Sequence, residues 1–93
     1  MDKKQARWCI RCYGQVQRVG FRYTALYLAQ RLSLTGWVRN LSDGSVQLEA
    51  QGHVSHLRQL LIRLKSQPHL HIVKAEVEEM PLLPGESRFR VAG

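Results

Sequence analysis

Residues 36–51 read GWVRNLSDGSVQLEAQ, and this stretch predicts a β-hairpin. In its second half, Val46, Leu48 and Ala50 alternate with polar side chains, as is typical of a strand with one buried face. The first half, residues 36–41, predicts the partner strand. Between the two strands, Asp43-Gly44 favours the positive φ angles of a tight type I′ turn.

An amphipathic helical pattern lies on each side of this hairpin. Before it, apolar residues recur at i, i+3, i+4 and i+7, which predicts a helix that begins near Phe21 or Arg22 and ends before Gly36. After it, four leucines with the same periodicity predict a second helix that ends before Pro68. We expect these leucines in the core: Leu57, Leu60, Leu61 and Leu64.

The outer strands complete the predicted order. Residues 7–13 alternate, with Trp8, Ile10 and Cys12 on one face, and Gly14 is expected to end this strand. Residues 73–78 predict a fourth strand, and Phe89 to Val91 a short fifth one. The order βαββαβ favours an α+β, ferredoxin-like two-layer sandwich, with both helices on one face of an antiparallel-rich sheet. Many unrelated functions use this arrangement.

Length and composition limit the possible classes of protein. The 93 residues suit a single domain, 1–93, with a polar N-terminal tail at 1–6. No apolar run approaches the roughly 18–20 residues of a membrane span, and residues 1–5 do not resemble a secretory signal, so we expect a cytoplasmic protein. The net charge of +7 favours anionic partners such as nucleic acid, acidic lipid or phosphorylated molecules.

The loop at 14–22, GQVQRVGFR, joins a predicted strand to a predicted helix start. Glycines allow successive backbone N–H groups to form an anion-binding nest, and the helix dipole adds partial positive charge there. Arg22 is placed to bind a phosphate in a bidentate manner. On spacing alone, an ordinary strand-to-helix loop with a solvated arginine is the favoured interpretation.

Asn40 is the second candidate. It shares a strand face with Val38, so we expect its side chain to point toward the helix layer. A carboxamide can both donate and accept hydrogen bonds, which suits holding a water molecule. The alternative is that Asn40 only shapes the approach to the hairpin turn.

Together, GQVQRVGFR at 14–22, GWVRN at 36–40 and DGSV at 43–46 resemble the acylphosphatase family. That family has a G-x-V-Q-G-V-x-F-R loop, followed by a G-[WYF]-V-x-N strand. The resemblance covers essentially the whole chain, and the two motifs together are specific. It implies the ferredoxin-like fold and hydrolysis of the carboxyl–phosphate bond of acyl phosphates.

The resemblance also implies roles for individual residues. Arg22 matches the family's phosphate-binding arginine, and Asn40 matches the asparagine that orients the attacking water. The implied backbone phosphate cradle is Gln15, Val16, Gln17, Arg18, Val19 and Gly20. Acetyl, carbamoyl and glyceroyl phosphates belong to the implied substrate class. We expect no cofactor, no metal, no nucleic-acid or membrane partner, and a monomer.

Arg18 departs from the family pattern, which usually has glycine at this position. A residue other than glycine resists positive φ, so the loop is either strained or rearranged if the cradle requires that geometry. Alternatively, Arg18 adds a cation at the rim and helps to capture substrate. A third reading is an acylphosphatase-like interaction domain that has lost activity.

The implied reaction suits a site without paired acid and base residues. The carboxylate released from an acyl phosphate has a conjugate acid with a pKa of about 4, so it departs without protonation. Phosphoryl transfer through a loose transition state mostly requires positioning and charge stabilisation. A nest, one arginine and a water-holding asparagine would supply both.

Metal binding is not favoured by the cysteines or histidines. Cys9 and Cys12 lie within one predicted strand, on opposite faces and about 10 Å apart, so they cannot readily share a metal or form a disulfide. We expect Cys12 in the core and Cys9 partly exposed. The histidines lack zinc-finger spacing and are expected to be solvated: His53, His56, His69 and His71.

The competing function is RNA binding by the open face of the sheet. Cations and an aromatic side chain are predicted there: Arg7, Arg11, Trp37 and Arg39, joined by Arg88 and Arg90. RNA-binding domains of this topology stack bases on aromatic residues of the central strands. Residues 45–51 contain no aromatic residue, and Glu49 is more simply a cross-strand partner for a neighbouring arginine.

Overall fold

The computed structural model describes residues 4–93, and its elements follow the predicted order. The strands and helices are β1 (Gln5–Gln15), α1 (Phe21–Arg31), β2 (Thr35–Asn40), β3 (Val46–His53), α2 (Val54–Lys65), β4 (His71–Met80) and β5 (Phe89–Val91).

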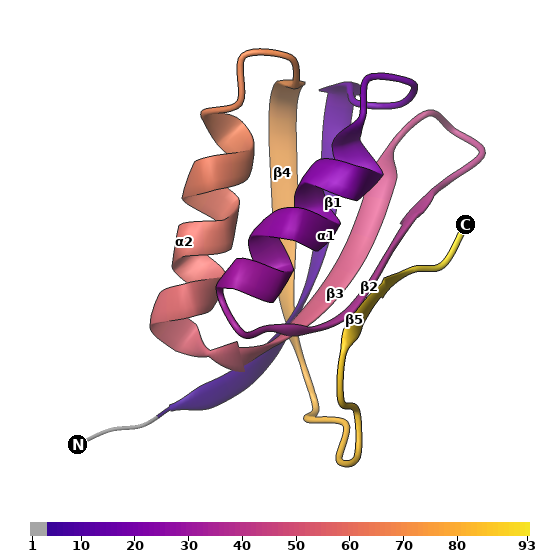
Figure 1. Cartoon of the computed structure of the whole chain (residues 1–93). Coiled ribbons are helices and arrows are strands. Elements are labelled where there is room, and N and C mark those ends of the chain that lie inside the picture. Colours follow the sequence, from indigo (N-terminus) through magenta and orange to yellow (C-terminus); the bar gives the residue numbers. More distant parts are fainter. Residues whose placement is uncertain (1–3) are drawn as a thin grey trace.

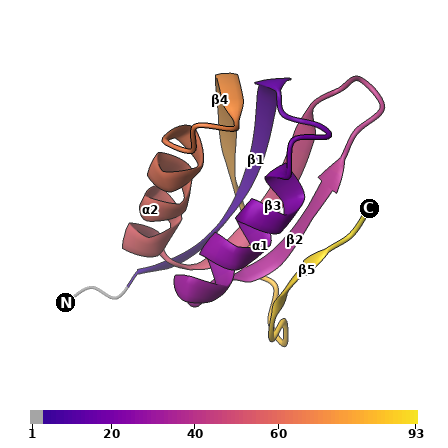
Figure 2. The same ribbon diagram turned by 45° about the horizontal axis from the view of Figure 1, so that its top comes forward.

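Both helices cover the same face of a five-stranded sheet (Figures 1 and 2). The strand order is β4-β1-β3-β2-β5, so β4 and β5 form the two edges. The pairs β1–β3, β1–β4 and β2–β3 are antiparallel, whereas β5 runs parallel to β2. The predicted ferredoxin-like α+β sandwich is confirmed, and β2 is identified as the partner of the fifth strand.

The core lies between the sheet and the helices. The predicted leucine stripe is confirmed, because Leu57, Leu60 and Leu64 of α2 are fully buried and Leu61 packs partly against the core. Each such burial contributes roughly 1.5–3 kcal/mol to folding. Within residues 4–93, neither helix is long and apolar enough to cross a bilayer.

The first strand is longer at both ends than predicted. Gln5 and Ala6, which we expected in the polar tail, belong to β1; residues 1–3 of that tail lie outside the described part of the chain. Gly14 does not end the strand but lies at an irregularity where the β1–β4 register shifts. Its φ is 129°, and a Cβ there would lie 2.1 Å from the His71 carbonyl oxygen, so only glycine fits.

The β2–β3 turn is not of type I′, which requires positive φ at both central residues. Among the described residues of this turn, only Gly44 has a positive φ, of 92°. The N–H of Gly44 donates to the Leu41 carbonyl at 3.1 Å, and the N–H of Leu41 donates to the Ser45 carbonyl at 2.9 Å. This is a three-residue loop in which a left-handed glycine follows the turn, so Asp43 needs no positive φ.

The C-terminus of α1 carries an unusual residue for its conformation. The N–H of Leu34 donates to the Ala29 carbonyl at 2.9 Å, and the N–H of Ser33 donates to the Gln30 carbonyl at 3.2 Å. This pair of bonds forms a Schellman motif, whose left-handed position is usually glycine. Ser33 occupies that position here with a φ of 56°.

Candidate functional site

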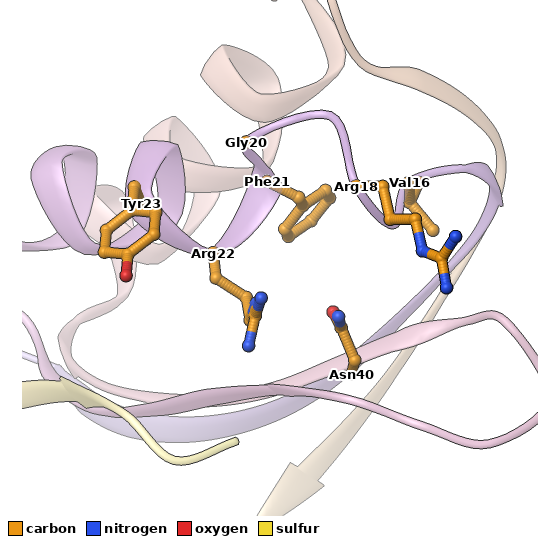
Figure 3. A pocket seen from close by; sticks show the side chains of 7 residues that line it. All are labelled: Val16, Arg18, Gly20, Phe21, Arg22, Tyr23 and Asn40. Carbon is orange, nitrogen blue, oxygen red and sulfur yellow. The ribbon is translucent and has the colours of Figure 1, made fainter.

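A cavity of about 100 Å³ lies where the loop between β1 and α1 approaches the end of β2 (Figure 3). The loop, the first turn of α1 and the last residue of β2 contribute its walls. The lining residues are Val16, Arg18, Gly20, Phe21, Arg22, Tyr23 and Asn40.

The start of α1 presents backbone donors at this cavity. Gly20 precedes the helix in a left-handed conformation, with a φ of 84°, and no side chain of the described residues caps the helix start. The first helical bond is donated by the Thr24 N–H to the Gly20 carbonyl, at 3.0 Å. The N–H groups before it, including those of Phe21 and Arg22, therefore have no partner within the helix. Together with the helix dipole, they favour an anion at this end.

Two arginines add full positive charge to the cavity. Arg22 projects from the first turn of α1 and is half-buried, whereas Arg18 projects from the loop and is exposed. Among residues 4–93, neither guanidinium makes an ion pair. Figure 3 shows the Arg22 guanidinium and the Asn40 side chain directed toward the same space, with the Arg18 guanidinium on the other side of Asn40 in this view. The cavity is therefore strongly electropositive.

Asn40 carries an unusual buried oxygen. Its backbone N–H donates to the Gly93 carbonyl at 3.1 Å, which fixes the end of β2. Its Oδ1 is buried and has no hydrogen-bond partner within the described residues. An unsatisfied buried acceptor costs about 1–3 kcal/mol. This oxygen is therefore available to accept a hydrogen bond from a small molecule in the cavity.

Gln17 fixes the loop to the β2–β3 hairpin. Its Nε2 donates to the Leu41 carbonyl at 2.7 Å and to the Ser45 carbonyl at 2.9 Å. No motif in the sequence indicates a role for this side chain as distinct from its backbone. The two bonds hold the loop that carries Val16 and Arg18 against the strand that carries Asn40.

Most of the predicted site residues meet at this cavity: Val16, Arg18, Gly20, Arg22 and Asn40. Asn40 lies on the helix side of the sheet, as its alternation with Val38 predicted. The remaining cradle residues do not line the cavity. Gln15 pairs with His71 in the sheet, the Gln17 side chain turns to the hairpin, and Val19 packs partly against the core.

Sequence reasoning missed two lining residues, Phe21 and Tyr23. Phe21 is 2% exposed and forms the apolar base of the cavity wall, whereas Tyr23 is 69% exposed. Their position next to Arg22 in the first turn of α1 could have predicted that they lie near the same cavity.

Arg18 adopts the conformation that its side chain disfavours. Its φ is 65°, which lies in the left-handed region. Position 18 thus has the positive φ that a residue other than glycine resists, and the backbone there is strained. Arg18 also lies at the rim of the cavity.

The two cysteines lie on opposite faces of β1, as predicted. Cys12 is buried in the core, where desolvation raises the pKa of its thiol to about 11. Cys9 is half-buried on the open face, where the Gln47 amide donates to its sulfur at 3.4 Å. Within residues 4–93, no three His, Cys, Asp or Glu side chains form a group that could hold a metal ion.

The histidines are not all simply solvated. His53 is the N-cap of α2, where its Nδ1 accepts a hydrogen bond from the Ser55 N–H at 3.2 Å. The His69 ring lies 3.1 Å from the Thr24 hydroxyl, so it contacts the first turn of α1.

The open face of the sheet is less available to RNA than its arginines suggested. Arg7 is only 3% exposed, and Glu49 and Glu86 each approach its guanidinium to 2.8 Å. The prediction that Arg7 contributes to an accessible basic face is therefore wrong. Glu49 is thus confirmed as a cross-strand partner of an arginine. Arg11 pairs with Asp43 at 2.8 Å. These carboxylates neutralise much of the predicted positive face.

Comparisons with known proteins show which family the chain is similar to. The acylphosphatase family model matches residues 8–91. An acylphosphatase of Pediococcus pentosaceus is 45% identical over 75 residues, covering 78% of this chain and 83% of that protein. The acylphosphatase of Bacillus licheniformis is 40% identical over 80 residues, covering 85% of this chain and 89% of that protein. The crystal structure of the Bacillus subtilis acylphosphatase superposes with a TM-score of 0.88 and 32% identity, covering 97% of this chain and all of that chain.

Proposed function

The chain belongs to the acylphosphatase family, and on this premise we propose that its cavity hydrolyses acyl phosphates to a carboxylate and inorganic phosphate. One observation carries the proposal. Within residues 4–93, one small cavity is lined by a half-buried guanidinium, by helix amides that no side chain caps and by a buried carboxamide oxygen that has no hydrogen-bond partner. These groups match the needs of phosphoryl transfer, which are positioning and charge stabilisation.

Arg22 and the loop backbone bind the phosphoryl group. The guanidinium fork donates to two phosphoryl oxygens, and the amides at the start of α1 donate to the remaining one. Charge spreads over these oxygens in the transition state, and donors fixed in advance stabilise it without reorganisation. The Gln17 side chain keeps the loop in position by its two bonds to the β2–β3 hairpin.

Asn40 holds the attacking water. Its buried Oδ1 accepts a hydrogen bond from the water, which directs an oxygen lone pair of that water toward phosphorus. As the new P–O bond forms, the bond between phosphorus and the acyl oxygen breaks, and its electron pair remains on the carboxylate. The water proton passes to a phosphoryl oxygen or to solvent. With a conjugate-acid pKa of about 4, the leaving carboxylate needs no proton donor.

The test is hydrolysis of benzoyl phosphate by the purified protein, followed by release of inorganic phosphate. We expect R22A and N40A each to lower kcat/KM by a factor on the order of 10²–10³ or more. R22A should also weaken the binding of inorganic phosphate, measured by calorimetry. N40A should leave that binding nearly intact, because Asn40 serves the water.

R31A is the matched control, since Arg31 lies on the same helix at its far end. It should hydrolyse benzoyl phosphate as the unmodified protein does. Near-normal activity in folded R22A would refute the assignment of Arg22. An unmodified protein that releases no phosphate would instead favour the interaction-domain reading.

We further propose that the protein acts on small molecules in the cytoplasm as a monomer. Within the described residues its two cysteines are free, and free cysteines are typical of proteins in reducing compartments. Light scattering at micromolar concentration tests the monomer: a mass of about 10.7 kDa is expected, and twice that mass would contradict it.

A further inference from the structure

We propose, resting on the function above, that Arg18 is a specificity residue. It selects acyl phosphates whose acyl moiety carries a second anionic group. The substrate would thus have a phosphoryl group inside the cavity and a carboxylate or further phosphate at its rim. Three features of the chain carry this inference.

The first feature is the size of the cavity. Its volume of about 100 Å³ lies well below the roughly 300–1,000 Å³ of pockets that enclose a drug-sized ligand. A cavity of this size admits a phosphoryl group and a water but does not enclose a bulky acyl moiety as well. The acyl moiety must therefore extend past the rim and contact the exposed lining residues.

The second feature is the position of Arg18 at that rim. Arg22 is half-buried, whereas Arg18 is exposed. The two guanidiniums are thus at different depths, and Figure 3 shows the Asn40 side chain between them in that view. Arg22 is placed for the transferred phosphoryl group, and Arg18 for a group outside it.

The third feature is the lack of any structural use for the Arg18 side chain. Within residues 4–93, it makes no hydrogen bond and no ion pair, so it does not stabilise the loop. Its φ of 65° nevertheless holds it in a conformation that suits glycine. Backbone strain of this kind is concentrated at functional sites. A cation at the cavity rim that has no partner among the described residues attracts an anionic group of the substrate.

The experiment compares three substrates that differ at one position of the ring: benzoyl phosphate, 4-carbamoylbenzoyl phosphate and 4-carboxybenzoyl phosphate. The last carries a negative charge at pH 7, because a carboxylic acid has a pKa of about 4. The carbamoyl compound has nearly the same shape without the charge. For the unmodified protein, we expect kcat/KM to be about fivefold higher for the carboxyl than for the carbamoyl compound, the upper range for an exposed ion pair.

R18Q is the informative variant, since it keeps a Cβ at position 18 and replaces the guanidinium with a shorter, neutral polar group. The preference for the carboxyl compound should disappear in R18Q and persist in part in R18K. It should also diminish in the unmodified protein as salt rises from 0.05 to 1 M, because the Debye length falls to about 3 Å. For each compound, kcat/KM of the unmodified protein is divided by that of R18Q. This ratio cancels the intrinsic reactivity of the compound.

Two results would overturn the proposal. One is an unmodified protein that hydrolyses all three compounds without preferring the charged one. The other is an R18Q variant that loses the same factor on every substrate, since Arg18 would then serve the transferred phosphoryl group. Failure to hydrolyse any of the three compounds would refute the proposed function itself. In the two results above, by contrast, the protein is active and only the role of Arg18 is refuted.

Discussion

Replacing Arg18 with glycine should stabilise this protein. A residue with a Cβ in the left-handed region costs about 1–2 kcal/mol, and the φ of Arg18 is 65°. Glycine removes that cost but loses about 0.5–1 kcal/mol more conformational entropy on folding. The side chain makes no hydrogen bond or ion pair within residues 4–93, so nothing else is lost. With the middle of each range, the net gain is about 0.75 kcal/mol.

The gain is measurable by urea unfolding and by Tm. For a domain of this size, about 0.75 kcal/mol corresponds to a rise in Tm of about 3–6 °C. R18A separates the two contributions of the substitution, because alanine removes the charge but keeps the Cβ. We expect R18A to lie close to the unmodified protein and R18G above both.

Ser33 provides an internal comparison. Apart from Arg18, Ser33 is the other described residue with a side chain and a positive φ, which is 56°. It lies at the C-terminus of α1, outside the candidate site. S33G should therefore give a similar gain in stability with unchanged hydrolysis. The reasoning is refuted if R18G is no more stable than R18A while S33G is stabilised as expected.

Three other predictions concern different parts of the molecule. Q17A should lower kcat/KM for benzoyl phosphate several-fold, and Q17E should do no better, because the two carbonyl oxygens bound by Gln17 require a donor. E86Q should destabilise the protein by about 1–2 kcal/mol at pH 7, measured by urea unfolding. Burial opposes ionisation of Glu86, but the hydrogen bonds from Arg7 and Thr35 and the positive charges of Arg7 and Arg90 together outweigh it and lower the pKa of the carboxyl below its ordinary value. This contribution is therefore present at neutral pH and lost as pH falls below about 4, where the two proteins should converge; a constant difference down to pH 2 would contradict it. Iodoacetamide at pH 8 should label Cys9 before Cys12 in the native protein, because burial raises the pKa of the Cys12 thiol to about 11; mass spectrometry showing equal labelling would count against this burial.

The layer architecture was predictable because the apolar periodicity changes plainly along the chain. The leucines of α2 and the alternation in β3 each follow one period without interruption. The ends of the elements were less predictable. Gly14 looked like the end of a strand, but the backbone continues through an irregularity that only glycine permits. The turn at Asp43-Gly44 was assigned the wrong type, because the dipeptide does not specify how many residues the loop contains.

The candidate site was predictable in its charged and polar members, because Arg22 and Asn40 fall in recognisable motifs. The contribution of Gln17 depends on bonds to backbone carbonyls across the fold, which no local pattern encodes. The burial of Arg7 likewise depends on Glu86, a residue 79 positions away. Long-range polar contacts of this kind follow from the tertiary arrangement and not from side-chain type.

β4 forms one edge of the sheet, and this position affects whether two molecules can associate. A ten-residue border strand exposes backbone groups that could template pairing with a second molecule and start aggregation. Glu76, Glu78 and Glu79 occupy this border, and all three are exposed. Two such borders brought together would oppose carboxylate to carboxylate. The acidic residues of β4 thus disfavour edge-to-edge pairing of the sheets of two molecules, although the protein as a whole is basic.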